Sequence, residues 1–335
     1  MRYLIVTFIV TVFLLTALPV FAQAPKPAPT AKPWVALKTP WGDPDLQGIW
    51  TSDDCIGTPM NRAAQFGDRL YYTEKELADR ESAIARQSET DRQETVSEAA
   101  RAGTGPPGHW AERARRPCRQ TSLVIDPPNG RTPDILPEAR LRPQGEGAGN
   151  NNPKADSPED FSYYIRCITR GVAGSIFPVI YGNGQQIIQA PGYVTILQEM
   201  VHESRVIPLD GRPHANPNIR SYMGDARGRW EGNTLVVETT NFLHGKTGIG
   251  LNGGGVPTSD ALKLTERFTR VGPNLVNYEV AIEDSKTYTA PFKVGFPLTQ
   301  EPGYENFEYA CHEGNNAMFN SLSGARAQEK AQQTK

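Results

Sequence analysis

Several sequence signatures that would identify a function directly are missing from this chain. It has no C-x-x-C pair, which excludes a zinc ribbon and a thioredoxin-type redox site. It has no H-E-x-x-H and no G-x-S-x-G, the signatures of zinc proteases and of α/β hydrolases. The glycine-rich residues 248–255 are not followed by a helix pattern, so they do not predict a phosphate-binding loop.

An excess of charge of either sign is also missing. The 35 Lys and Arg and the 37 Asp and Glu residues give a net charge of -2, and the pI is about 6.3. A nucleic-acid-binding protein normally carries a basic patch or stripe, so we expect no nucleic-acid partner. The 335 residues suffice for one large or two small domains, and the 31 Gly and 28 Pro indicate many turns.

Long apolar runs are missing except at the N-terminus. Arg2 precedes the apolar residues 3–18, and a V-F-A sequence ending at Ala22 supplies a signal-peptidase site. We predict a signal peptide over residues 1–22, cleaved after Ala22, and a periplasmic or secreted protein without membrane contact after cleavage. An uncleaved anchor is the alternative, because the apolar run is almost long enough to span a bilayer. Pro19 and the V-F-A sequence favour cleavage.

Cysteine is scarce, with four residues: Cys55, Cys118, Cys167 and Cys311. An even number of cysteines in an exported protein predicts two disulfides. Four cysteines allow three pairings, and the sequence does not choose among them. We favour Cys55–Cys118 and Cys167–Cys311, because the second pair would connect the start of the β-rich region to its end.

The N-terminal half has little periodic pattern. Residues 23–43 are rich in Pro and Ala and predict an extended spacer. Residues 44–170 predict one helix and long loops. A T-x-x-E capping box begins that helix, which we expect over residues 73–102 with few apolar side chains. Residues 140–160 are either a lid over a site or a disordered insertion.

Residues 171–325 predict a mainly β fold. The alternation of apolar and polar residues is clearest in residues 275–283, where every second residue from Val276 to Ile282 is apolar. Tight turns separate about eight such segments and no helix pattern interrupts them, so we expect an antiparallel meander and exclude parallel β-α-β topologies. We expect a lipocalin-like barrel of about eight strands, and a β sandwich is the alternative.

The chain ends in a helix-forming stretch. Met318 and Leu322 are spaced i, i+4, so we expect a C-terminal helix to pack on the outside of the barrel, as the N-terminal helix does. Residues 326–335 are expected to be a frayed tail.

Three stretches together resemble a family of exported bacterial proteins: PDLQGIWT (residues 44–51), GDARGRWEGNTLVVETTNF (residues 224–242) and YACHEGN (residues 309–315). The stretches VIPLDGRPH (residues 206–214) and ERFTRV (residues 266–271) are similar to the same family. The resemblance covers most of the mature chain. It implies that these stretches belong to one recurring domain, and it implies no activity, cofactor or substrate.

The first candidate catalytic residue is Glu266. In a strand over residues 262–270 it shares a face with Leu264 and Phe268. If that face is buried, the protonated carboxyl is favoured, which suits general acid or base catalysis. The alternative is a structural ion pair with a nearby arginine, because buried charges are usually paired.

The second candidate is a zinc site. His202, His214 and His312 would supply three ligands, and catalytic zinc needs three protein ligands plus an open position for water. Glu203 and Glu313 stand next to two of these histidines, and His312 and Glu313 are then also candidate catalytic residues. The alternative is that the histidines make structural hydrogen bonds. No other cofactor is expected.

The third candidate is a set of arginines within a short stretch. They are Arg205, Arg212, Arg220, Arg227 and Arg229. Guanidinium groups suit carboxylate or phosphate ligands. The alternative is internal pairing with the interleaved carboxylates Asp210, Asp225 and Glu231.

These residues lead to three hypotheses of function. The first is an exported β-barrel protein that binds a small organic molecule in a pocket whose polar mouth is lined by Arg205, Arg212, His214, Arg227 and Trp230. The second is a periplasmic enzyme on the same scaffold, either a metal-assisted hydrolase or an acid–base lyase or isomerase. The third is an envelope structural or interaction protein with structural histidines. The ligand, the reaction type and the oligomeric state stay open.

Overall fold

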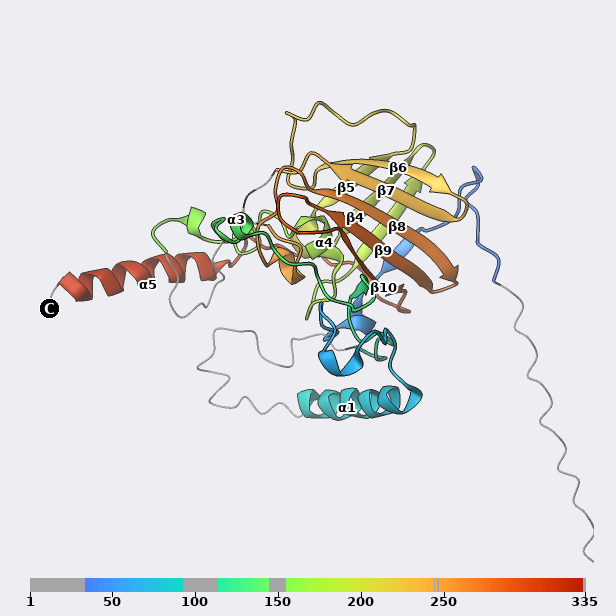
Figure 1. Ribbon diagram of the computed structural model, residues 1–335, viewed down its shortest axis with the longest axis horizontal. Coiled ribbons are helices and arrows are strands. Elements are labelled where there is room, and N and C mark those ends of the chain that lie inside the picture. The colour runs from blue at the N-terminus through green and yellow to red at the C-terminus, as the bar shows by residue number, and fades with distance from the viewer. Residues whose placement is uncertain (1–33, 93–113, 145–154, 244, 246, 334–335) are drawn as a thin grey trace, which may run out of the picture. The chain divides into compact units, whose positions relative to one another are not determined.

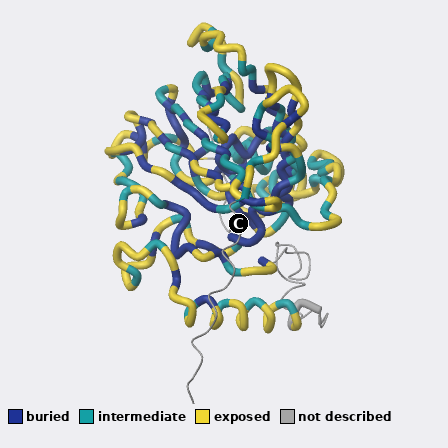
Figure 2. The backbone as a smooth tube through the Cα atoms, turned by 90° about the vertical axis from the view of Figure 1, so that its right-hand side faces the viewer, coloured by how far each residue is buried: buried dark blue, intermediate teal, exposed yellow. Residues whose placement is uncertain are grey.

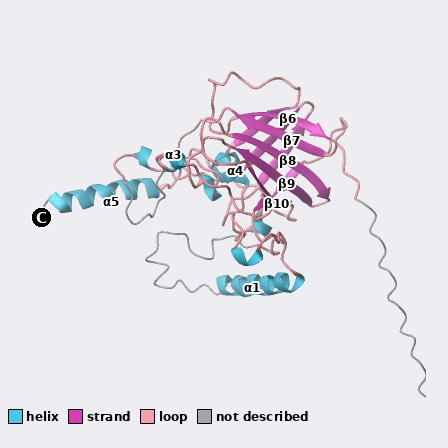
Figure 3. Ribbon diagram, in the orientation of Figure 1, coloured by secondary structure: helices cyan, strands magenta, loops and turns pink. Residues whose placement is uncertain are grey.

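The protein is mainly β, with two antiparallel sheets. The computed structural model describes residues 34–92, 114–144, 155–243, 245 and 247–333. Within these residues, a four-stranded sheet has the order β1-β3-β4-β5 and a six-stranded sheet has the order β2-β10-β9-β8-β7-β6 (Figure 1, Figure 3). The strands are β1 (Gly48–Trp50), β2 (Val124–Asp126), β3 (Gln185–Ala190), β4 (Tyr193–Gln198), β5 (Ser204–Pro208), β6 (Asp225–Glu231), β7 (Thr234–Thr240), β8 (Lys263–Gly272), β9 (Leu275–Glu283) and β10 (Phe292–Thr299). The helices are α1 (Glu74–Arg92), α3 (Pro137–Arg140), α4 (Gly171–Ile176) and α5 (Asn316–Gln333).

Two uninterrupted meanders confirm the predicted antiparallel connectivity. Strands β3, β4 and β5 pair in sequence order, and so do β6 to β10. In β9 every second residue from Val276 to Ile282 is at most 1% exposed, so the alternation in the sequence corresponds to one buried and one solvated face. At the β6–β7 turn, Gly232 has a φ of +61°, the left-handed conformation that a two-residue hairpin requires.

The two sheets face each other across one core. Ile187 and Ile207 of the smaller sheet belong to the same buried cluster as Leu235 of the larger sheet, and Figure 2 shows the buried backbone along the strands. Arg205 on β5 reaches Glu266 on β8, and β8 is separated from the β6 edge by β7. This contact requires facing sheets. The expected lipocalin-like barrel is not confirmed, because the described strands form two sheets and not one closed ring.

The two edges between the sheets differ. At one edge Thr51, which follows β1, and Thr299 of β10 exchange two backbone hydrogen bonds of 2.8 and 2.9 Å. At the other edge, β5 and β6 approach each other without pairing in the described structure. Gly228 of β6 permits this approach, because a Cβ atom there would lie 2.5 Å from Leu209 Cδ2. The sheets are therefore bridged along one side only.

The N-terminal helix begins as predicted. The Thr73 N–H donates to Glu76 Oε2 at 2.7 Å and the Glu76 N–H donates to Thr73 Oγ1 at 3.3 Å, which is the capping box. Among the α1 residues whose burial is described, only Leu77 is buried, so the helix is largely solvated (Figure 2). Residues 93–102 of the predicted helix lie outside the described residues, as do residues 145–154 of the predicted 140–160 loop.

The C-terminal helix does not pack as predicted. Neither Met318 nor Leu322 is buried, and the same holds for every described residue of α5. The third large apolar residue of α5, Phe319, is 72% exposed, so the helix has no buried apolar stripe. The predicted frayed tail is also wrong up to Gln333, because the good helix formers Ala, Arg, Gln, Glu and Lys continue α5 through it.

Both disulfides pair as we favoured. Cys55–Cys118 has a Cα–Cα distance of 4.6 Å and Cys167–Cys311 one of 5.6 Å. Two disulfides indicate an oxidising, extracytoplasmic environment. None of the helices in the described residues is long and apolar enough to cross a membrane. The predicted signal peptide, residues 1–22, and most of the spacer, residues 23–43, lie outside the described residues.

Candidate functional site

Arg205 and Glu266 form a sealed ion pair between the sheets. Arg205 Nη1 and Nη2 donate to Glu266 Oε2 and Oε1 at 2.6 and 3.0 Å, and the Tyr278 hydroxyl donates to Oε1 at 3.2 Å. All three side chains are at most 3% exposed. Burial raises the pKa of Tyr278, and the charge of Glu266 adds to this effect. Glu266 thus has the structural pairing that was the alternative to catalysis, and it offers no surface to an external substrate.

Three of the other four predicted arginines also meet carboxylates, and Arg220 instead donates from Nη1 to the carbonyl oxygen of Phe242 at 3.3 Å. The ion pairs are Arg212–Asp210, Arg227–Asp225 and Arg229–Glu231. The hydrogen bonds from the Arg212 side chain lower the pKa of Asp210 to about 2. Internal pairing therefore occupies guanidinium groups that we expected at the mouth of a pocket. Trp230 packs half-buried against the core, and its Nε1–H has no partner in the described structure.

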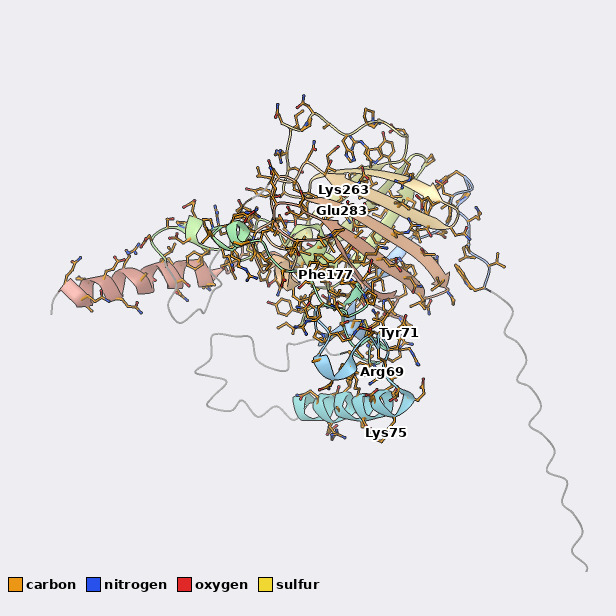
Figure 4. All side chains as sticks on the ribbon, viewed as in Figure 1. Arg69, Tyr71, Lys75, Phe177, Lys263 and Glu283 are labelled. Carbon is orange, nitrogen blue, oxygen red and sulfur yellow. A yellow bond between two sulfur atoms is a disulfide. The ribbon has the colours of Figure 1, made fainter. Side chains whose placement is uncertain are left out.

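His214 belongs to the same polar network as Arg227. His214 Nδ1 lies 2.9 Å from Asp225 Oδ2, and Nε2 lies 3.3 Å from Glu238 Oε1. Glu238 also pairs with Lys263 Nζ at 2.8 Å, and Lys263 lies beside Glu283 (Figure 4). The hydrogen bond from Lys263 lowers the pKa of Glu238. Both ring nitrogens of His214 are engaged, so neither is free for a metal ion.

The predicted zinc site is wrong for the described residues. No three His, Cys, Asp or Glu side chains among them are close enough to hold a metal ion. His202 Nδ1 instead lies 3.0 Å from the carbonyl oxygen of Tyr309, and His312 is exposed in the turn before α5. The three histidines lie on separate loops whose arrangement the sequence pattern does not specify.

A hollow of about 480 Å³ lies between the turn at residues 163–168 and residues 308–317. This volume is within the roughly 300–1,000 Å³ typical of small-molecule sites. We call it the tyrosine hollow. The wall side chains used below are Tyr164, Cys167, Tyr181, Tyr309, Glu313 and Asn315.

Covalent and polar contacts hold the two walls of the tyrosine hollow together. The Cys167–Cys311 disulfide connects them, and Asn315 Nδ2 donates to the carbonyl oxygen of Ile165 at 2.9 Å. Cys167 has a φ of +56°, which turns the chain sharply at that point. On the sheet side, the Tyr304 hydroxyl donates to Glu199 Oε2 at 2.5 Å. The C-terminal segment is thus fixed against the rest of the molecule before α5 begins.

Three tyrosines give the hollow an aromatic wall with polar tips. The hydroxyl oxygens of Tyr164 and Tyr181 are 3.3 Å apart, and the rings of Tyr181 and Tyr309 stack with centroids 6.4 Å apart and planes inclined by 15°. Burial raises the pKa of Tyr164 and of Tyr309. The hydroxyls of Tyr164 and Tyr309 therefore keep their protons at neutral pH and can donate hydrogen bonds to a ligand.

Arg170 lies behind this wall. Its Cζ is 5.6 Å from the centroid of the Tyr164 ring, and the residue is 0% exposed. Burial lowers the pKa of Arg170, while Tyr164, Tyr181 and Tyr309 oppose this effect. A positive charge is thus held close to three phenol groups.

Of the residues predicted from the sequence, Glu313 and the disulfide cysteines Cys167 and Cys311 line the hollow, and its tyrosines were missed. Tyr164, Tyr181, Tyr309 and Arg170 lie in turns and loops without periodicity. One signal was present: Tyr164 precedes Cys167 closely and Tyr309 precedes Cys311, so the favoured disulfide already placed two aromatic residues near each other.

Comparison with protein-family models, with curated protein sequences and with solved structures finds no match to this chain. The inference of function therefore starts from the geometry of the tyrosine hollow.

Proposed function

We propose that this is an exported protein that binds a small organic molecule in the tyrosine hollow. The observation that carries the proposal is a space of about 480 Å³ bordered by the stacked rings of Tyr181 and Tyr309. Small-molecule sites are typically concave and aromatic, with a few placed polar groups. Here the polar groups are the tyrosine hydroxyls and, at the rim, Glu313.

In this proposal the two sheets are the scaffold that carries the site. The two facing sheets, bridged at Thr51 and Thr299, would form a barrel-like body whose mouth the hollow flanks. Residues 309–315, the YACHEGN stretch, form part of one wall, and we propose that the family resemblance of this stretch reflects the site. An acid–base enzyme that uses Glu266 has less support, because Arg205 holds that carboxylate inside the core.

Ligand-observed NMR on the mature protein with a panel of small aromatic molecules tests the proposal. We expect binding to the wild type and a roughly three- to tenfold weaker affinity for Tyr181→Ala, because aromatic stacking contributes about 0.5–1.5 kcal/mol. Tyr71→Ala is the matched control, since Tyr71 is an exposed tyrosine outside the hollow (Figure 4). Equal affinities for both variants, or no binding to the wild type, would contradict the proposal.

A further inference from the structure

Arg170 is a buried arginine without a counter-charge. Its Nη2 donates to Asn252 Oδ1 at 2.5 Å, but its Nε and Nη1 have no hydrogen-bond partner in the described structure. Among the described residues no carboxylate forms an ion pair with it, although it is 0% exposed. A buried charge without a partner is costly, and native proteins rarely retain one without a use for it.

The other two buried arginines of the described residues have more hydrogen-bond partners, so burial alone does not leave a guanidinium group without partners. Arg205 has the carboxylate of Glu266. Arg62 donates from Nε to Ser122 Oγ at 3.2 Å and from Nη1 to the carbonyl oxygen of Pro128 at 2.6 Å. Arg170 differs from Arg205 in having no carboxylate partner, and from both in having two guanidinium nitrogens, Nε and Nη1, without a hydrogen-bond partner in the described structure.

The glycine-rich loop at residues 248–255 fixes Arg170 from behind. Asn252 adopts a φ of +57° and presents its amide oxygen to the guanidinium. Gly253 allows the loop to approach closely, because a Cβ atom there would lie 2.5 Å from the carbonyl oxygen of Arg170. The ring of Tyr164, which borders the hollow, is another contact of the guanidinium group.

An anion site needs a hydrogen-bond donor as well as a positive charge, and the tyrosine hydroxyls supply that donor. In the 3.3 Å contact between Tyr164 and Tyr181 one hydroxyl donates and the other accepts. The Tyr181 hydroxyl also hydrogen-bonds that of Tyr309, so three hydroxyls share two contacts and one proton is left over for a ligand oxygen. The rim residues Glu308 and Glu313 are exposed, so water and salt screen their negative charges more than the charge of buried Arg170.

We propose that the tyrosine hollow selects a small organic anion of the carboxylate class, whose charged end is held at the Tyr164 and Tyr181 hydroxyls in front of Arg170. This inference rests on the proposed function of the hollow and specifies its ligand. Arg170 acts as a positioning residue that favours the negative charge, and the Tyr181–Tyr309 pair contacts the apolar part.

Calorimetric titration with three probes that share one ring but differ in charge tests the selection. The probes are benzoate, benzamide and benzyltrimethylammonium. We expect benzoate to bind roughly tenfold more tightly than benzamide, since hydrogen bonds to a charged group are about twice as strong as neutral ones, and the cation to bind weakest. Equal affinities, or a preference for the cation, overturn the anion assignment and leave the small-molecule site standing. Binding of none of the three overturns both.

Arg170→Met separates the role of charge from a merely structural role. We expect the variant to lose the roughly tenfold preference for benzoate over benzamide while its affinity for benzamide stays within about twofold of the wild type. Arg212→Met, at an exposed arginine outside the hollow, is the control and should keep the preference. A preference that survives in Arg170→Met contradicts the proposal. The wild-type comparison decides the question even if the variant does not fold.

Discussion

Arg205 and Arg170 are both buried, yet they lie in opposite chemical settings. Arg205 belongs to β5, pairs in register with Ile196 of β4, and meets Glu266 across the core. Arg170 precedes α4 in an irregular segment, and its guanidinium group has a single amide as its hydrogen-bond partner. Regular strands place opposite charges together, whereas the loops around the hollow leave a charge open. Departures from internal consistency of this kind tend to mark functional sites.

The largest effect is expected from removing the carboxylate that pairs with Arg205. Glu266→Leu leaves Arg205 buried without its carboxylate and should lower the free energy of unfolding by about 3–5 kcal/mol. Urea denaturation measures this. The double variant Arg205→Met, Glu266→Leu is the control and should recover most of the loss, because no charge is then left unpaired. A single variant as stable as the wild type would show that the pair does not behave as a buried salt bridge.

Removal of the disulfide at the hollow should have the next largest effect. Cys167→Ser, Cys311→Ser should cost about 2–5 kcal/mol, because the bond closes a long loop in the unfolded chain. Hydrogen exchange should rise most in residues 304–317, and in β7 to β9 only by the amount that the lost global stability explains. The matched control is Cys55→Ser, Cys118→Ser, which should give residues 304–317 no rise beyond that of β7 to β9. A Cys167→Ser, Cys311→Ser variant in which residues 304–317 rise no more than β7 to β9 would contradict this local role.

Alkaline pH should destabilise the core through Tyr288. Burial raises the pKa of Tyr288 to about 12, above its value of about 10 in an unfolded chain. Because the folded form holds its proton more tightly, this contribution to stability is complete below pH 10 and is lost as the pH rises toward 12. Denaturant midpoints measured across this range should fall, and Tyr288→Phe should flatten the decline. An unchanged decline in the variant would assign the effect to other tyrosines.

The smallest effect on stability is expected from replacing Arg170, the arginine without a carboxylate partner. Arg170→Met removes a buried charge with little compensation, so the free energy of unfolding should stay within about 1 kcal/mol of the wild type. Thermal unfolding without added ligand provides the measurement. Arg205→Met, measured beside it, should be clearly less stable because it leaves Glu266 unpaired. A loss of 3 kcal/mol or more in Arg170→Met, about the cost of breaking a buried pair, would mean that Arg170 is structural.

The regular parts of the fold could be predicted from the sequence for a physical reason. In a strand with one buried face, apolar and polar residues alternate along the sequence, so the period of two from Val276 to Ile282 indicated β9 directly. The capping box at Thr73 identified the start of α1 because cap contacts are local. The even number of cysteines in an exported chain suggested two disulfides, although pairing depends on distances that only folding sets.

The site could not be predicted in the same way. Tyr164, Tyr181 and Tyr309 come from three separate irregular segments, and no local pattern brings such segments together. The zinc-site prediction failed for the same reason, because His202, His214 and His312 lie on separate loops that the fold does not bring together. The prediction that α5 packs on the β domain failed for another reason. The spacing of Met318 and Leu322 suits packing, but spacing alone does not supply a surface for α5 to contact.

The order in which the chain is synthesised gives the Cys167–Cys311 bond a further meaning. The strand β10 ends at Thr299, so every described strand is made before the second wall of the hollow. A nascent chain that stops short of Cys311 contains both sheets and lacks the partner that Cys167 needs. The second wall of the proposed binding site therefore needs both the later part of the chain and an oxidant. Under the proposed function, ligand binding would depend on the redox state of the compartment, because a reduced chain lacks the bond that connects the two walls.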